Sequence, residues 1–210
     1  MNQRRRINTR ARVGAHIPIR RVIVIVCEGE KTERIYFKQF RIRGSEVEVR
    51  VPSVGETDPV GLVESAIKQK DLIAYDPSRG DEIWCVYDCD EHTDQELKKA
   101  LKLASKNSVN IAFSNPAFEL WYLLHYGYYS DEMSRGLAYE RLRRHIPNYD
   151  KNVRINEILD PRVGQALGNA QRLKEYHLGQ GHQLNLREAN PLTDVDRLVQ
   201  LLRRIVLPLE

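Results

Sequence analysis

Two short runs of apolar residues, each followed at once by acids, place the strongest constraint on how this chain folds. The run VIVIV covers residues 22–26 and leads into Glu28, and the run IWCVY covers 83–87 and leads into Asp88 and Asp90. Apolar runs with no polar alternation are typical of strands that are buried on both faces. Strands of this kind occur where helices cover both sides of a parallel sheet, so the two runs favour an α/β fold.

The segments around these runs predict strands that alternate with helices as far as about residue 128. Apolar spacing predicts helices over 32–40 and 93–105, one that opens at Pro59 with Asp58 as its N-cap, and one that opens at Pro116. Further strands are expected at 46–52 and 109–114, and a turn at 77–81. This alternation predicts a Rossmann-like parallel sheet flanked by helices.

The last third of the chain has a different pattern. Helices are predicted over 135–146, 163–180 and 193–205, with no strand between them. We therefore expect three parts, which are a basic N-terminal arm (1–21), an α/β core (22–128) and a C-terminal helical extension packed on the core (129–210).

Composition favours a soluble protein of the cytoplasm. Of the 210 residues, 41% are hydrophobic and 30% are charged, and no apolar run approaches the roughly 20 residues of a membrane span. The Arg-rich start has no apolar stretch typical of a signal peptide. Three cysteines are too few for a disulfide scaffold and fit a reducing compartment. We expect no membrane partner, and a homo-oligomer is possible.

The basic residues are unevenly distributed. Residues 1–21 carry seven arginines and no acid, in a chain of net charge +4. Such a run is typical either of a solvated tail or of an arm that binds phosphates. A basic helix later in the chain can likewise follow a phosphate backbone or form a solvated face. The candidates for contacts with nucleic acid are Arg4, Arg5, Arg6, Arg10, Arg12, Arg141 and Arg144.

The acids that follow the two apolar runs predict a metal site. Ligands of open α/β sheets bind beyond the carboxyl ends of the strands, where Glu28, Asp88 and Asp90 are expected. Side chains at i and i+2 point the same way in extended chain, and acids that converge repel unless a cation lies among them. Mg²⁺, or Mn²⁺, prefers such oxygen ligands. The alternative is that Asp88 and Asp90 cap the next helix while Glu28 is a solvated loop residue.

Four segments of the chain resemble a known family. A strand ending in Glu-Gly and a later strand ending in D-x-D resemble the Toprim domain of topoisomerases, primases and several nucleases. The segments CEGEKTERIYF, VYDCDEH, SNPAFELWYLLHY and NPLTDVDRLV are similar to RloB-type Toprim proteins, which are small bacterial proteins associated with restriction and abortive-infection loci. The resemblance covers about residues 20–205. It implies a Toprim-type core, Mg²⁺-dependent phosphoryl transfer by Glu28, Asp88 and Asp90, and an ATPase partner of the ABC or SMC-like kind.

Other residues near these motifs are candidates for supporting roles. The resemblance makes Glu33 a candidate for another metal ligand, although an acid in a first helical turn also interacts well with the helix dipole. Lys31 can meet a scissile phosphate or remain solvated. Asn115 can bond a metal ligand or phosphate, or alternatively Ser114 or Asn115 caps the next helix. Glu119 is expected to reach the same pocket, because a Glu among aromatic residues is costly without a partner.

These expectations favour one function and leave another open. Topoisomerases and primases need further modules for which this chain is too short, whereas a nuclease needs a metal ion, water and a phosphodiester. We therefore expect a metal-dependent nuclease of DNA or RNA in a bacterial phage-defence system. The alternative is a non-catalytic protein with a Toprim shell that binds nucleic acid or regulates the ATPase. A zinc site at Cys85, Cys89 and His92 is not expected, because a fourth ligand in register is missing.

Overall fold

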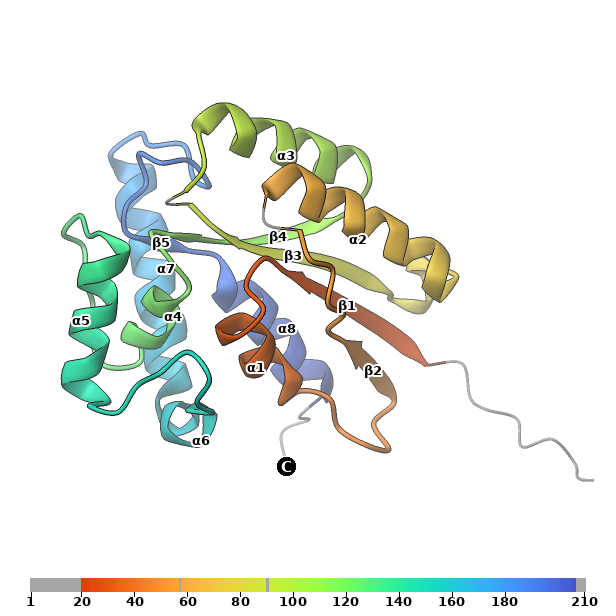
Figure 1. Ribbon diagram of the computed structural model, residues 1–210, viewed down its shortest axis with the longest axis horizontal. Coiled ribbons are helices and arrows are strands. Elements are labelled where there is room, and N and C mark those ends of the chain that lie inside the picture. Colours follow the sequence, from red (N-terminus) through yellow and green to blue (C-terminus); the bar gives the residue numbers. More distant parts are fainter. Residues whose placement is uncertain (1–19, 57, 90, 207–210) are drawn as a thin grey trace, which may run out of the picture.

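The computed structural model describes residues 20–56, 58–89 and 91–206, which form one open five-stranded sheet with helices on both faces (Figure 1). The strand order is β2-β1-β3-β4-β5, and every neighbouring pair is parallel except β4 and β5. The predicted Rossmann-like α/β class is therefore confirmed. The strands are β1 (Arg21–Cys27), β2 (Val47–Arg50), β3 (Glu82–Asp88), β4 (Asn110–Asn115) and β5 (Leu192–Thr193).

The path of the chain explains why both faces are covered. Helix α1 (Thr32–Lys38) joins β1 to β2 on one face, and α2 (Pro59–Ile73) and α3 (Asp94–Lys106) lie on the other (Figure 1). The chain steps outward from β1 to β2 and then returns across β1 to β3. Right-handed crossovers in opposite directions place their helices on opposite faces. The reversal falls between β1 and β3, which is where open sheets of this kind bind ligands.

The pairing of the two acid-ended strands agrees with the sequence. Residues Val22 to Cys27 of β1 are all buried, and Ile25 lies opposite Trp84 of β3. The two apolar runs, expected as strands of one parallel sheet, are therefore parallel neighbours in it. Their last residues therefore reach the same edge of the sheet.

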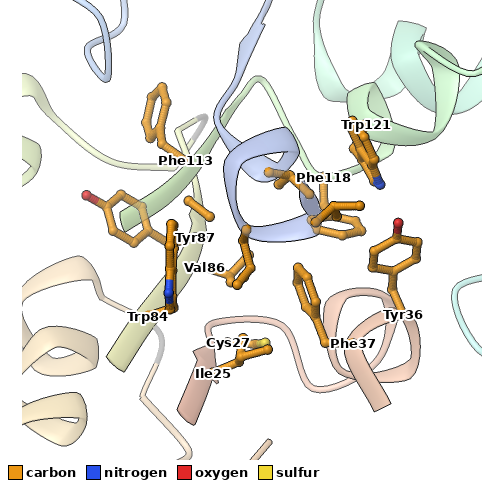
Figure 2. Packing of buried hydrophobic residues seen from close by; sticks show 14 of the residues in the cluster. Ile25, Cys27, Tyr36, Phe37, Trp84, Val86, Tyr87, Phe113, Phe118 and Trp121 are labelled. Carbon is orange, nitrogen blue, oxygen red and sulfur yellow. The ribbon is translucent and has the colours of Figure 1, made fainter. Parts of the chain in front are cut away.

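An aromatic cluster fixes α1 against α4 (Glu119–Leu123) beneath this edge. The ring centroids of Tyr36 and Phe118 lie 5.7 Å apart, and those of Phe37 and Phe118 lie 5.9 Å apart (Figure 2). The sequence prediction placed the start of this helix at Pro116, whereas it begins at Glu119. Because of this packing, the first turns of α1 and α4 lie close to each other at this edge of the sheet.

The C-terminal third returns to the sheet, so the prediction that no strand follows residue 130 was wrong. Strand β5 is antiparallel to β4, with Thr193 opposite Ser114, and the Asp194 amide donates to the Phe113 carbonyl at 2.8 Å. A strand of two residues is too short to show an apolar alternation. The remaining helices are α5 (Arg135–His145), α6 (Asn156–Leu159), α7 (Val163–Gly179) and α8 (Val195–Val206), with 3₁₀ turns η1 (Pro77–Arg79) and η2 (Asp160–Arg162).

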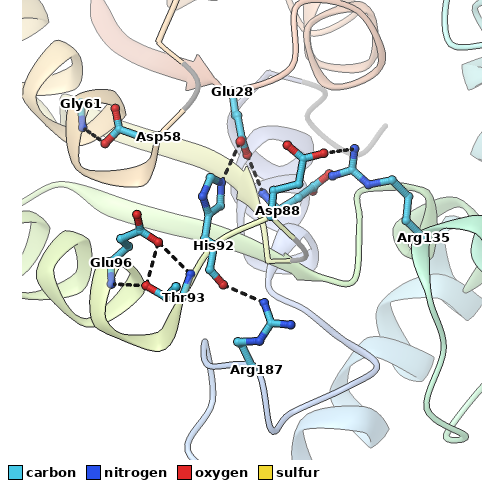
Figure 3. Close-up of polar contacts among 10 residues, drawn as sticks. Glu28, Asp58, Gly61, Asp88, His92, Thr93, Glu96, Arg135 and Arg187 are labelled. Atoms are coloured by element: carbon cyan, nitrogen blue, oxygen red, sulfur yellow. Dashed lines mark hydrogen bonds and ion pairs between the residues drawn. The ribbon is translucent and has the colours of Figure 1, made fainter.

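The start of α2 is capped as the sequence predicts. The Asp58 side chain accepts from the Gly61 amide at 2.9 Å, which confirms it as the N-cap of α2 (Figure 3).

Within the described part of the chain, no helix is both long and apolar enough to cross a membrane.

Candidate functional site

A pocket of about 290 Å³ opens beyond the carboxyl ends of β1 and β3, and we call it the acid pocket. Most of its lining comes from the loop after β1, the first turn of α1 and the first residue of α4. Acids and cations both face it. The acids are Glu28, Glu30, Glu33, Asp88, Glu91 and Glu119, the cations are Lys31, Arg135 and Lys151, and Gly29 and Thr32 complete the wall.

Glu28 is fixed across the ends of the two strands. Its Oε2 atom accepts from the Asp88 amide at 3.0 Å, and its Oε1 atom lies 2.9 Å from Nε2 of His92 (Figure 3). The Glu28 amide donates to the Val86 carbonyl at 2.9 Å, which continues the β1–β3 ladder. The hydrogen bond to Glu28 raises the pKa of His92. The alternative that Glu28 is a solvated loop residue was therefore wrong.

Asp88 is buried and only partly neutralised. Its Oδ2 atom accepts from Nη2 of Arg135 at 3.3 Å (Figure 3), whereas its Oδ1 atom is buried and has no hydrogen-bond partner among the described residues. Burial raises the pKa of Asp88 well above its ordinary value. The carboxylates of Glu33, Glu119 and Glu28 raise it further, against the opposing charge of Arg135. An acid in these surroundings favours the approach of a cation.

Asp88 does not cap the helix that follows it. The N-cap of α3 is Thr93, whose Oγ1 atom accepts from the Glu96 amide at 3.3 Å, while the Glu96 side chain accepts from the Thr93 amide at 2.8 Å (Figure 3). This reciprocal capping box satisfies the first turn of α3. The capping interpretation therefore fails for Asp88, and Asp90 lies outside the described residues.

Glu33 and Glu119 reach the acid pocket from α1 and α4. Burial, together with the nearby charges of Glu119 and Glu28, raises the pKa of Glu33 to about 7. The Glu33 carboxylate lies over Gly29, where an added Cβ would come within 2.1 Å of Oε2. The glycine of the Glu-Gly pair therefore leaves the space that Glu33 occupies. Glu119 is almost fully buried, and its Oε1 atom accepts from the hydroxyl of Tyr149 at 3.1 Å.

Asn115 has a structural role beside the acid pocket. Its side-chain nitrogen donates to the carbonyls of Arg187 at 3.0 Å and Ala189 at 2.8 Å, and so holds the segment before β5 against β4. It lines a neighbouring pocket and does not line the acid pocket. Helix α4 has no side-chain cap among the described residues, so the alternative that Ser114 or Asn115 caps this helix was wrong.

The predicted basic residues are distributed over other parts of the chain. Arg141 and Arg144 lie on α5, with Arg141 5.4 Å from the ring centroid of Tyr129 and Arg144 paired with Glu140 at 2.5 Å. The five candidate arginines of the arm lie outside the described residues.

The oxygen ligands that the acid pocket offers are of the chemical type that a hard divalent cation prefers. All are carboxylates, which Mg²⁺ and Mn²⁺ prefer, and the unpartnered Oδ1 atom of Asp88 is the kind of buried oxygen that a cation satisfies. These carboxylates do not form a preformed set of metal ligands. Among the residues that the structure describes, no three His, Cys, Asp or Glu side chains form a group that could hold a metal ion.

Three residues of this region were not anticipated from the sequence. Arg135 and Lys151 line the acid pocket from segments far along the chain, and no local pattern marks either of them. His92 was considered as a zinc ligand, whereas it is the partner of Glu28. Its place within VYDCDEH, directly after the acids, was the available signal.

An open, mostly parallel α/β sheet with a carboxylate-lined pocket at its point of reversal defines this chain as a Rossmann-like protein with a candidate site at the strand ends. Residues 23–202 match the family model described as RloB-like protein, and the chain belongs to this family. Searches of curated proteins and of solved structures found no match.

Proposed function

We propose that this protein is a nuclease that hydrolyses phosphodiester bonds of DNA or RNA with Mg²⁺ or Mn²⁺ in the acid pocket. One observation carries the proposal. Carboxylates from α1, β3, α4 and the loops after β1 and β3 face a single pocket at the reversal point of the sheet, and their mutual repulsion is unfavourable without a cation. A protein that merely bound phosphates at this pocket would gain nothing from clustered negative charge.

The acids that end the two strands have the main role in this proposal. Asp88, Glu28 and Asp90 would hold the cation, and Glu33 would be a further ligand. A bound divalent ion supplies Lewis-acid activation of the phosphoryl oxygen and a hydroxide at neutral pH. Hydrolysis forms one P–O bond from the oxygen of water and breaks the P–O bond to the leaving nucleotide, whose oxygen takes the proton.

The cations of the pocket hold the substrate in place. Arg135 extends from the start of α5 to within 3.3 Å of Asp88, and Lys31 and Lys151 line the same pocket. A guanidinium group binds phosphate oxygens with fixed geometry, and ammonium groups supply compact positive charge. These three residues are therefore proposed to bind the scissile phosphate and to orient it toward the carboxylates.

The wider setting of the protein is also proposed. The resemblance of the four motif segments supports a Toprim-type core, an ATPase partner of the ABC or SMC-like kind, and a role in phage defence. The alternative is a non-catalytic protein that binds nucleic acid or regulates the ATPase, and it predicts that the acids can be neutralised without loss of function.

The test is cleavage of plasmid, single-stranded DNA and total tRNA in Mg²⁺, Mn²⁺ or chelator. Asp88→Asn is expected to lose cleavage by orders of magnitude while its circular dichroism spectrum is unchanged, because the charge that holds a hard cation is removed. The control is Asp71→Asn, an exposed acid of α2, which should cleave as the parent does. A parent rate in Asp88→Asn, or equal cleavage in chelator, would refute the proposal.

A further inference from the structure

A second pocket, of about 490 Å³, lies beside the open edge of the sheet, and we call it the basic groove. Val47 and Val49 of β2 line it, and no described strand pairs with the outer side of β2. Its cationic lining residues come from the start of β1, the end of α1, the loop after α1 and the segment before α6. They are Arg20, Lys38, Arg41, Arg43 and Arg154.

The positive charge of the basic groove is not neutralised within the described chain. None of its five cationic side chains forms a hydrogen bond or ion pair with another described residue. Among its described lining residues the one acid is Glu48, whose Oε1 atom already accepts from Nε of Arg50 at 2.7 Å. That hydrogen bond lowers the pKa of Glu48, and the charges of Arg20 and Arg41 lower it further. The groove therefore has a positive electrostatic potential that attracts an anion from outside the chain.

The basic groove is connected to the acid pocket by two short segments. Helix α1 contributes Glu33 to the acid pocket and Lys38 to the groove, a separation of about 8 Å at the helical rise of about 1.5 Å per residue. Lys151 lines the acid pocket and Arg154 lines the groove, so their Cα atoms are at most about 11 Å apart. A nucleic-acid strand carries one phosphate about every 3.4 Å along a duplex axis. The nearest lining residues of the two sites are therefore about two to three phosphate steps apart, whereas Arg20 and Glu28 lie at opposite ends of β1, about 26 Å apart at about 3.3 Å per residue.

We propose that the basic groove binds the phosphate backbone of the same nucleic-acid strand that enters the acid pocket. This inference rests on the proposed function for the identity of the strand. Repeated anionic charge matches five cations from four segments of the chain, and backbone contacts of this kind position a strand without reading its sequence. The groove thus sets which phosphate reaches the acid pocket.

The experiment measures binding of the full chain to a fluorescent single strand and to the matching duplex in chelator, so that cleavage does not interfere. The groove variant combines Arg41→Gln, Arg43→Gln and Arg154→Gln. It is expected to bind on the order of tenfold more weakly or worse at moderate salt. The slope of log affinity against log salt should fall by about 0.7–0.9 for each phosphate that the variant no longer neutralises.

The matched control removes the same charge elsewhere. Lys98→Gln, Lys99→Gln and Lys102→Gln on α3 are exposed and line neither pocket, and this variant should keep the parent's salt slope. Circular dichroism and melting curves establish that both variants fold.

Some of the remaining outcomes overturn the inference, and one refutes the nuclease alone. An unchanged affinity and slope in the groove variant would remove the groove from nucleic-acid binding, as would a parent that binds neither probe. Polyglutamate serves as a probe for acidic proteins. A groove variant that loses polyglutamate binding but binds both nucleic acids as the parent does would assign the groove to an acidic protein instead. A parent that binds through the groove but cleaves nothing in Mg²⁺ or Mn²⁺ refutes the nuclease and leaves the groove standing.

Discussion

At the scale of single residues, Glu33 shows how strongly the acid pocket acts on one side chain. Its pKa is raised to about 7 by burial and by Glu119 and Glu28. Between about pH 4.5 and 7, folded Glu33 keeps a proton that the unfolded chain has lost. The folded state then binds more protons, so the free energy of unfolding falls as pH rises through this window. Full ionisation costs on the order of 3 kcal/mol at about 1.4 kcal/mol per pKa unit.

Glu33→Gln should remove this part of the pH dependence. In chelator, urea unfolding is expected to give similar stability for variant and parent near pH 4.5, and a more stable variant at pH 8. Asp88, whose pKa is also raised, contributes a residual slope of the same sign in both proteins. Mg²⁺ should stabilise the parent at pH 8 more than the variant. Parallel curves for the two proteins would contradict this account of Glu33.

The sequence allowed some residues of the site to be predicted and hid others. Glu28 and Asp88 directly end apolar runs, so their common edge followed once the strands were identified as parallel. Glu119 followed from the cost of a carboxylate among aromatic residues. Arg135 and Lys151 come from loops and helix ends whose position depends on the packing of the whole C-terminal third, which no local period encodes.

At the scale of elements, long periodic segments were predictable and short ones were not. The strands and helices up to residue 115 were anticipated because their apolar spacing extends over several residues. Strand β5 was missed because pairing at its two residues is set by distant parts of the chain. Oγ of Ser114 lies 3.0 Å from Oγ1 of Thr193, and Lys174 of α7 pairs with Asp194 at 3.1 Å and Asp196 at 2.7 Å.

Lys174 is expected to hold α7 to the β5–α8 corner. All three partners are buried, and burial raises the pKa of Asp196 although the charge of Lys174 opposes this. Lys174→Met leaves two uncompensated buried carboxylates, so the free energy of unfolding should fall by about 3–5 kcal/mol at pH 7. Adding Asp194→Asn and Asp196→Asn should recover part of this loss. A Lys174→Met protein as stable as the parent in urea would show that the ion pairs of Lys174 with Asp194 and Asp196 do not stabilise the fold.

At the scale of the whole molecule, negative and positive charge are separated along α1. The acid pocket lies at the start of this helix and the basic groove at its end. In the sequence, the arm arginines precede Arg20, which lines the groove. Arg21 belongs to β1, where its Nη2 atom pairs with Glu82 at 2.7 Å, so strand β1 begins one residue before the predicted start. A truncation that tests the arm should therefore end at residue 19.

Deletion of residues 1–19 should weaken nucleic-acid binding and flatten its salt dependence if the arm binds phosphates. If Arg4, Arg5, Arg6, Arg10 and Arg12 each neutralise a phosphate, the slope of log affinity against log salt should fall by about 3.5–4.5. A full-length chain with these five arginines changed to Gln separates the effect of charge from that of length, and should match the deletion. Because the arm and the groove supply different cations, combining the deletion with the groove variant should flatten the slope further than either change alone. An unchanged slope in both arm variants would make residues 1–19 a solvated tail and leave the basic groove as the main electrostatic contact.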